Sequence, residues 1–339
     1  MSELSRRDFL KHTAVGLACT VLPLDTMENQ NPILGSGEHR YECIHDWIKA
    51  PRWIKFGDTH GVAQDAAGNI YIAHTVGEGS ASKNTICVYN SEGKFLDSWG
   101  EQFVGGAHGL DIRKEGDTEF IYHCDVNHRK VVKTRLDGTV EWEISDVKAS
   151  GKYSSGENFV PTNVAFHPNG DFFIGDGYGS SWIHRFDSKG NYKSTFGGRG
   201  AEKGQVNSPH GLWLDDRGSE PMLVVADRSN RRLQYFSLDG QHVKFVTDGI
   251  RLPCHFSIQK GVMLIPDLES TITLLDPDNK VIAHLGDGHP TNLRGKPASD
   301  FIAGKFIHPH DAMFLANGDI LVAEWVPQGR VTLLRKLSS

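Results

Sequence analysis

One structural unit recurs six times along the chain, and this repetition limits the possible folds more than any other feature. Each copy begins with a short apolar segment, turns at Gly or Asn, and continues into a second apolar segment that ends on a polar or acidic residue. The clearest copy runs from Thr162 to Asp176 and then from Trp182 to Gly190. Apolar and polar residues that alternate between such turns predict antiparallel β-hairpins.

The spacing of the copies predicts a closed ring of antiparallel sheets. Their first residues stand 48, 54, 48, 44 and 56 residues apart, within reach of a four-stranded propeller blade. The copies start at His60, His108, Thr162, His210, Cys254 and His310. We therefore predict an all-β fold, a six-bladed β-propeller of NHL-type repeats within residues 40–339. We expect the segment Tyr41–Trp47 to add the outer strand of the last blade, which closes the ring and covers a sheet edge.

The first 30 residues have the pattern of an export signal. A twin-arginine motif spans Ser5–Lys11, and the apolar run Thr13–Leu24 that follows is too short to span a membrane comfortably. We expect residues 1–30 to be a signal peptide read by the twin-arginine export machinery. The protein would then be periplasmic or extracellular, either released or tethered by an uncleaved signal. The alternative is an ordinary N-terminal helix that begins with a basic pair.

Composition narrows the classes of partner. A net charge of −6 argues against nucleic acid or an anionic membrane as the main partner, and we expect a monomer without a transmembrane span that binds a small molecule or peptide. The 17 histidines favour metal chemistry. Export permits disulfides, yet the spacing of the cysteines after the signal fits no framework, so we predict no essential bridge. These cysteines are Cys43, Cys87, Cys124 and Cys254.

Histidine occupies the first position of four of the six copies. The first strand of a propeller blade lines the central channel, so we expect these side chains at one mouth of that channel. His108, His210 and His310 come from blades two, four and six, and alternate blades of a six-fold ring give a trigonal set. Three neutral imidazoles with one open position suit a catalytic zinc site. The alternative is that histidines inherited with the repeat only fill the mouth with hydrogen bonds.

Other polar residues near the blade starts favour structural roles. His255 lies one residue past its blade's equivalent position, and because neighbours in a strand face opposite sides, we expect it to point away from the axis. Asp311 directly follows His310, and it either binds a hard cation or closes the blade by hydrogen bonding. An acidic residue at each second-strand end is typical of a repeat whose carboxylates cap turns. This series is Asp125, Asp176, Asp227, Asp267 and Glu324, with His74 in the first copy.

Four motifs resemble the peptidyl-α-hydroxyglycine α-amidating lyase family. They are Phe159–Tyr178 with its Asp-Gly-Tyr, Val206–Leu212 with Pro-His-Gly, Ala226–Phe236, and Pro309–Asp311. The similarity covers most of the propeller in order and spacing, and it is densest from Phe159 to Phe236. The resemblance implies a metal-dependent lyase that cleaves a carbinolamide into an amide and glyoxylate.

The resemblance also implies two metal sites. The family holds a divalent metal, usually zinc, with three histidines that match His108, His210 and His310. A structural calcium would be bound by Asp311 and by the backbone carbonyl of Leu110.

Two further residues match the family's substrate-binding machinery. The catalytic tyrosine matches Tyr178, and one substrate-binding arginine matches Arg228. Each has a simpler interpretation from the residues alone, since Tyr178 also suits a turn and Arg228 belongs to an Asp-Arg pair that often bridges within such blades.

The sequence departs from the family pattern at several positions. Thr75 stands where the family has a second essential arginine, His308 replaces a methionine near the third histidine ligand, and Gly179 replaces a cysteine, so that disulfide is absent. His60 has no family counterpart. We expect His60, His74 and His308 to support the site from outside the metal set or to be structural.

Two alternatives to an enzyme of this family remain open at the level of the sequence. One is a non-catalytic exported NHL propeller that binds a protein, peptide or glycan, which the loss of the arginine at Thr75 favours. The other is a calcium-dependent, lactonase-like hydrolase, although such sites use carboxylates and asparagine around a hard cation. We expect the lyase to act on a hydroxylated amide or a related small molecule outside the cytoplasm.

Overall fold

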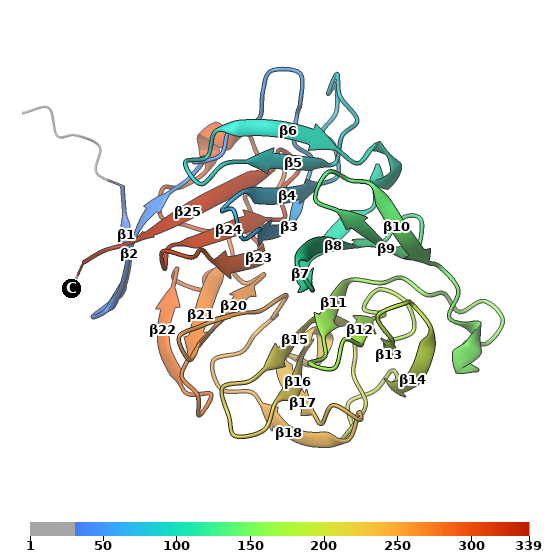
Figure 1. Cartoon of the computed structure of the whole chain (residues 1–339). Helices are drawn as coiled ribbons and strands as arrows, with labels where there is room; N and C mark the ends of the chain where they lie inside the picture. The colour runs from blue at the N-terminus through green and yellow to red at the C-terminus, as the bar shows by residue number, and fades with distance from the viewer. Residues whose placement is uncertain (1–30, 339) are drawn as a thin grey trace, which may run out of the picture. The chain divides into compact units, whose positions relative to one another are not determined.

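Six β-sheets surround a central channel in the described part of the chain, residues 31–338 of this computed structural model (Figure 1). Five sheets contain four strands, and the sixth contains five. The prediction of a six-bladed β-propeller is therefore confirmed. The predicted signal peptide, residues 1–30, lies outside the described residues.

Each blade contributes one strand to the lining of the channel and stacks three more strands outward from it, or four in blade six. The inner strands are β3 (Thr59–Gln64), β7 (Ala107–Glu115), β11 (Asn163–Phe166), β15 (Pro209–Asp215), β19 (Ser257–Gln259) and β23 (Pro309–Phe314). The second strands are β4 (Ile70–His74), β8 (Thr118–Asp125), β12 (Phe172–Gly175), β16 (Met222–Asp227), β20 (Val262–Asp267) and β24 (Ile320–Glu324). The third strands are β5 (Ile86–Tyr89), β9 (Lys130–Arg135), β13 (Trp182–Phe186), β17 (Arg232–Phe236), β21 (Thr271–Leu275) and β25 (Arg330–Lys336).

The outer strands of the first five blades come from the same repeat as the rest of the blade. They are β6 (Phe95–Trp99), β10 (Val140–Ile144), β14 (Tyr192–Gly197), β18 (His242–Val246) and β22 (Val281–Leu285). The helices within residues 31–338 are four 3₁₀ turns, and none of them is long and apolar enough to cross a membrane. They are η1 (Glu101–Phe103), η2 (Lys148–Ser150), η3 (Arg228–Asn230) and η4 (Ala298–Asp300).

The N-terminal segment closes the ring by completing blade six. β2 (His39–Ile44) pairs antiparallel with β25, for example Tyr41 opposite Lys336, which confirms the predicted role of this segment. A further strand that the sequence pattern did not indicate, β1 (Ile33–Ser36), pairs with the outer edge of β2. The first and last strands of the propeller therefore belong to one sheet (Figure 1).

Apolar side chains pack between neighbouring blades and hold the ring together. Between blades three and four, for example, Phe173 and Ile183 pack against Leu212 and Val225, and all four side chains are buried. Burying a side chain of this size contributes about 1.5–3 kcal/mol to folding. The apolar residues of the alternating pattern that predicted the strands are thus also the residues that pack between the sheets.

The acids at the second-strand ends fix the loops that lead into the channel-lining strands. The carboxylate of Asp176 accepts backbone N–H bonds from Val160 and Ser180, both at 2.6 Å. Asp267 accepts one from Leu252 at 2.8 Å, and Glu324 one from Ile307 at 2.7 Å. Their predicted structural role is confirmed. Hydrogen bonds to charged groups contribute about 1.5–3 kcal/mol each, so these contacts stabilise the segments that lead into β11, β19 and β23.

Candidate metal centre at the channel mouth

Four buried histidines meet at one end of the channel. His60, His108, His210 and His310 each stand second in an inner strand, in β3, β7, β15 and β23. The ring centroids of His108, His210 and His310 form a nearly equilateral triangle with sides of 4.9, 4.7 and 4.7 Å. The structure thus brings together the rings of the three histidines that blade counting selected, whereas the three whose donor nitrogens all lie within 4.8 Å of one another are His60, His108 and His310.

Each ring of this triangle is oriented by a backbone carbonyl of the next blade. The Nδ1 atoms lie 2.9, 2.9 and 3.0 Å from their carbonyl oxygens. The pairs are His108 with Thr162, His210 with Cys254, and His310 with His60. Because a carbonyl only accepts hydrogen bonds, each Nδ1 carries the ring proton and each Nε2 keeps a free lone pair. Metal-binding histidines are oriented in this way.

Burial keeps these three imidazoles neutral. Burial lowers the pKa of His108 to about 3, and it lowers the pKa of His210 and His310 well below the ordinary value. The cation of Arg228 lowers all three further. Neutral imidazole is the form that binds a metal.

Tyr178 reaches this triangle from the loop that follows β12. Its hydroxyl lies 3.1 Å from Nε2 of His108 and 3.0 Å from Nε2 of His210. One hydroxyl carries one proton, so it donates to one of these nitrogens while the other faces an oxygen lone pair. Nε2 of His310 is buried and has no hydrogen-bond partner within residues 31–338. The centre therefore holds more lone pairs than protons, which a bound cation would correct.

The aromatic ring of Tyr178 faces a groove outside the channel. The tyrosine is 43% exposed, and it lines this groove together with Arg129, Asn158, Trp182 and Arg199. Its hydroxyl end touches the histidines while its ring faces the groove. A molecule held in this groove would have its reactive end beside the histidine centre.

Arg228 offers a positive charge without an acidic partner. Its guanidinium carbon lies 5.2 Å from the centroid of the Tyr178 ring, and Nη2 donates to the hydroxyl of Ser208 at 3.3 Å. The preceding Asp227 pairs instead with Arg232 at 2.6 Å, so the proposed Asp-Arg bridge within the blade does not involve Arg228. Among residues 31–338, no carboxylate lies within ion-pair distance of Arg228, which leaves it available to an anion.

The side chain of Tyr178 is electrostatically coupled to this arginine. Burial of its hydroxyl raises the pKa of Tyr178 above the ordinary value, and the cation of Arg228 opposes that rise. The phenol is therefore protonated at neutral pH unless a further positive charge stabilises the phenolate.

His255 lies inside the channel, so the prediction that it points away from the axis is wrong. Its Nδ1 is 2.5 Å from Oδ1 of Asp311 in blade six, and its Nε2 is 3.7 Å from Oδ1 of Asp111 in blade two. β19 begins only at Ser257, so His255 precedes the strand and strand alternation does not set its direction. Burial alone would lower the pKa of His255, but the carboxylates of Asp311 and Asp111 outweigh it and raise that pKa to about 10. The two carboxylates therefore favour the protonated form of His255, while the amide nitrogen of Asn163 also lies 3.0 Å from its Nε2.

His255 contacts the carboxylate that the resemblance assigns to calcium. Oδ2 of Asp311 accepts the backbone N–H of Val62 at 2.9 Å, and Oδ1 contacts His255. Oδ2 of Asp311 is therefore paired, whereas its Oδ1 has no hydrogen-bond partner within residues 31–338 and makes only the ion-pair contact with His255. Through its Oδ2, Asp311 joins blade six to blade one, the second of the two roles considered for it.

The remaining predicted residues lie apart from the triangle. His74 sits within blade one, where its Nδ1 accepts the backbone N–H of Val76 at 3.1 Å. Nδ1 of His308 donates to the carbonyl of Leu268 at 2.8 Å. A side chain at position 179 would collide with Asp176, because a Cβ built on Gly179 lies 2.0 Å from its Oδ1.

The sequence patterns did not indicate Arg294, which lies near Thr75, the residue that stands where the family has a second arginine. Its Nη2 pairs with Oδ1 of Asp58 at 2.8 Å, and its guanidinium stacks 3.7 Å from the centroid of Trp325. The backbone carbonyl of Asp58 accepts the N–H of Thr75 at 3.1 Å. Arg294 belongs to the long connection between β22 and β23, which has no repeat pattern that would have indicated its position.

The fold and this centre together define a class: a six-bladed propeller with a trigonal histidine set at its channel mouth. Comparison with proteins of known sequence places the chain near one group of enzymes. It is 27% identical to peptidyl-alpha-hydroxyglycine alpha-amidating lyase 1 of Drosophila melanogaster, over 94% of this chain and 65% of the fly protein. It is 29% identical to a probable lyase of the same name from Caenorhabditis elegans, over 54% of this chain and 56% of that protein.

A rat relative shows how partial these matches are. The chain is 29% identical to peptidylglycine alpha-amidating monooxygenase of Rattus norvegicus, over 60% of this chain but only 23% of the rat protein. The chain thus spans less than two thirds of the curated relatives it matches. No family model matches the sequence. The resemblance inferred from the motifs is confirmed, and these relatives support a lyase-type enzyme.

Solved structures support the fold alone. A streptogramin B lyase has a TM-score of 0.59 at 12% identity and covers 86% of this chain and 98% of its own. Virginiamycin B lyase from Staphylococcus aureus has a TM-score of 0.56 at 11% identity and covers 87% and 100%.

Proposed function

We propose that this protein is a metal-dependent carbon–nitrogen lyase that cleaves a carbinolamide of the peptidyl-α-hydroxyglycine type into an amide and glyoxylate. One observation carries the proposal: three neutral imidazoles with anchored Nδ1 atoms surround the hydroxyl of Tyr178. A propeller that only binds a partner needs no such set. The lyase relatives add independent support.

A divalent metal, zinc first among the candidates, fits the donor set of His108, His210 and His310. The donors are neutral, and the excess of lone pairs at the centre favours a cation. When bound, the metal would supply Lewis acidity that lowers the pKa of the substrate hydroxyl.

The protein's own residues would carry the proton and hold the substrate. Tyr178, as phenolate, would take the proton of the α-hydroxyl, since its own hydroxyl already lies among the histidines. The O–H electrons then form the carbonyl of glyoxylate, the C–N bond breaks, and the nitrogen takes a proton to become the amide. The guanidinium of Arg228 would bind the substrate carboxylate in a charge-assisted contact. The groove beside Tyr178 would hold the acyl part of the substrate.

Metal analysis combined with a product assay tests this proposal. We expect about one zinc-like ion per chain in the wild type and none in the His108→Ala, His210→Ala double variant. Wild-type protein should release glyoxylate from α-hydroxyhippurate, whereas the double variant should not. His128→Gln is a surface control, because its side chain is 47% exposed. A metal-free wild type would refute the metal centre, and a metal-loaded wild type that releases no glyoxylate would favour the non-catalytic binding propeller.

We also propose that the folded protein is exported through the twin-arginine route to the periplasm or beyond, as a monomer acting on a small-molecule or peptide substrate. The motif at Ser5–Lys11 supports this. Replacing Arg6 and Arg7 with lysine should retain the protein in the cytoplasm, which cell fractionation would detect. Equal export of both forms would contradict the proposal.

A further inference from the structure

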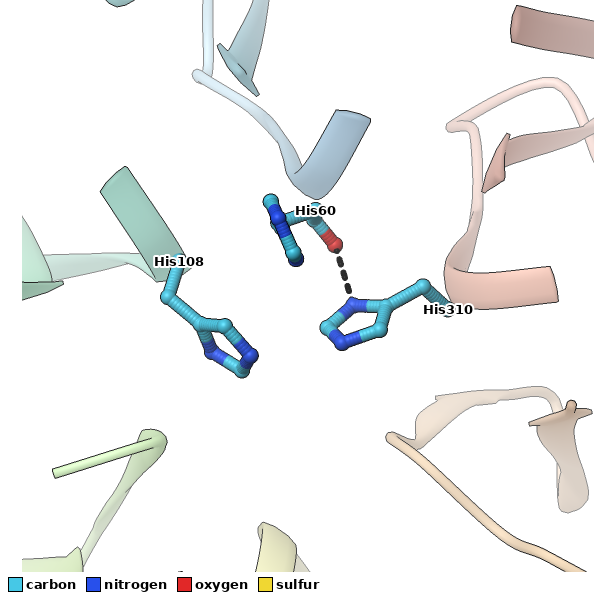
Figure 2. A group of neighbouring side chains, drawn as sticks. All are labelled: His60, His108 and His310. Atoms are coloured by element: carbon cyan, nitrogen blue, oxygen red, sulfur yellow. Dashed lines mark hydrogen bonds between the residues drawn. The ribbon is translucent and has the colours of Figure 1, made fainter. Parts of the chain in front are cut away.

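His60 places a fourth imidazole beside two members of the histidine triangle, His108 and His310 (Figure 2). Its ring centroid lies 4.8 Å from that of His108 and 4.7 Å from that of His310. A ring nitrogen of each of these three residues lies within 4.8 Å of the other two. Figure 2 shows the three rings converging on one space from three different strands.

Blade one differs from the other two blades that orient the triangle in the side chain of the residue that supplies the carbonyl. Blades one, three and five each supply a carbonyl to an Nδ1–H, from His60, Thr162 and Cys254. Only blade one adds an imidazole at this position. The carbonyl role alone therefore does not explain why histidine stands at position 60.

The polar atoms of His60 point to a ligand. The residue is 8% exposed, and its Nδ1 is buried without a hydrogen-bond partner within residues 31–338. A histidine that only filled the mouth would be expected to have its buried nitrogen paired.

We propose that His60 is a fourth ligand of the metal held by His108, His210 and His310. The proposal rests on the proposed metal centre and extends it. His60 comes from blade one and His210 from blade four, which are opposite blades of the ring. The two rings therefore approach the His108–His310 pair from opposite sides.

This donor set has consequences for the kind of ion. The donor nitrogens that lie within 4.8 Å of one another belong to His60, His108 and His310, so a movement of the His210 ring would be needed to complete a four-histidine set. Four imidazoles would fill a tetrahedral ion and leave no position for substrate. The working ion must therefore accept five or six ligands, and a nitrogen-rich set of this kind suits first-row ions such as cobalt, nickel or copper as well as zinc. With no anionic ligand, the ion keeps its full positive charge for an anionic substrate.

Metal affinity and coordination number test this inference on the full-length protein. Apo-protein is titrated with zinc against a chromophoric chelator, and cobalt-loaded protein is examined by visible absorption. We expect His60→Gln to bind zinc about 100-fold more weakly than wild type or weaker still. Removing a residue that only supports a metal ligand typically weakens metal binding by about 10–100-fold. The cobalt bands should also intensify as the coordination number falls. His308→Gln is the matched control and should retain wild-type affinity, because its Nδ1 is bound to Leu268.

A second measurement needs no variant and so does not depend on folding of His60→Gln. Pulsed electron paramagnetic resonance of copper-loaded wild-type protein counts the coordinated imidazoles, and we expect four. Three imidazoles, or unchanged affinity and cobalt spectrum in a folded His60→Gln protein, would overturn the role of His60 but leave the three-histidine centre intact. A wild type that binds no metal would overturn both proposals.

Discussion

Replacing His255 with glutamine would remove the positive charge between two buried carboxylates. Asp111 and Asp311 are only 7% and 4% exposed, and they approach His255 from blades two and six. Asn163 donates to Oδ2 of Asp111 at 2.7 Å, but an amide carries no charge. In the variant, the carboxylates would lie in the channel without a cation, at the level where Asp311 links blade six to blade one.

The expected cost follows from this burial. Removing one partner of a buried ion pair destabilises a protein by about 3–5 kcal/mol, because the remaining charge is left uncompensated. For a domain of this size, 1 kcal/mol corresponds to a change in Tm of about 2 °C, so we expect a fall of about 6–10 °C. A His255→Gln, Asp311→Asn double variant removes one carboxylate as well and should recover part of this loss.

Calorimetry at pH 7 in zinc-containing, calcium-free buffer measures these differences. Adding millimolar calcium should raise the Tm of His255→Gln, since the ion can replace the lost charge, but should not raise that of the wild type. The Asp311→Asn single variant separates the loss of the Val62 hydrogen bond from the charge effect. The reasoning is refuted if His255→Gln melts within 1 °C of the wild type, or if the wild type itself depends on calcium.

Three further predictions concern the site and the core. Tyr178→Phe should keep its metal but lose about 10²–10⁴-fold in glyoxylate release, as expected for a proton-transfer group; full activity would exclude that role. Arg228→Gln should raise KM about 10–100-fold for a carboxylate substrate but not for its carboxamide analogue, because one charge-assisted contact of about 1.5–3 kcal/mol is lost; an equal effect on both would contradict the assignment. Burial lowers the pKa of His45, His74 and His184 to about 4 each, so the unfolded chain takes up protons first as the pH falls. The free energy of unfolding should therefore decrease between pH 6.5 and pH 4 by up to about 1.4 kcal/mol per pH unit for each histidine, and a urea midpoint that stays constant over this range would contradict it.

The repeat made much of this architecture predictable from the sequence. A blade is a local unit, so its hairpins follow from turns and alternation, and the ring follows from the number of copies. The same count placed His108, His210 and His310 on alternate blades, and the acids such as Asp176 in phase at the second-strand ends. Each of these features depends on the position within the repeat, which the sequence displays directly.

Features that depart from the repeat could not be predicted from the position within the repeat. His255 faces the channel because the chain before β19 is irregular, and strand alternation was the wrong rule for it. Arg294 reaches Asp58 from a connection without repeat structure. β1 extends a blade beyond the four strands that the repeat supplies. In each case tertiary contacts determine where the residue or strand lies, and no local periodicity of the sequence indicates these contacts.

The shared sheet of blade six has a consequence for how the protein folds. Tyr41 pairs with Lys336 at a sequence separation of 295, so the propeller contains a contact of very high contact order. Blades one to five can form as the chain emerges, but blade six lacks its outer strands until β25 is made and meets β2. Its completion is therefore expected to be the last step of folding, and the same seam is where the ring should first open under mechanical load.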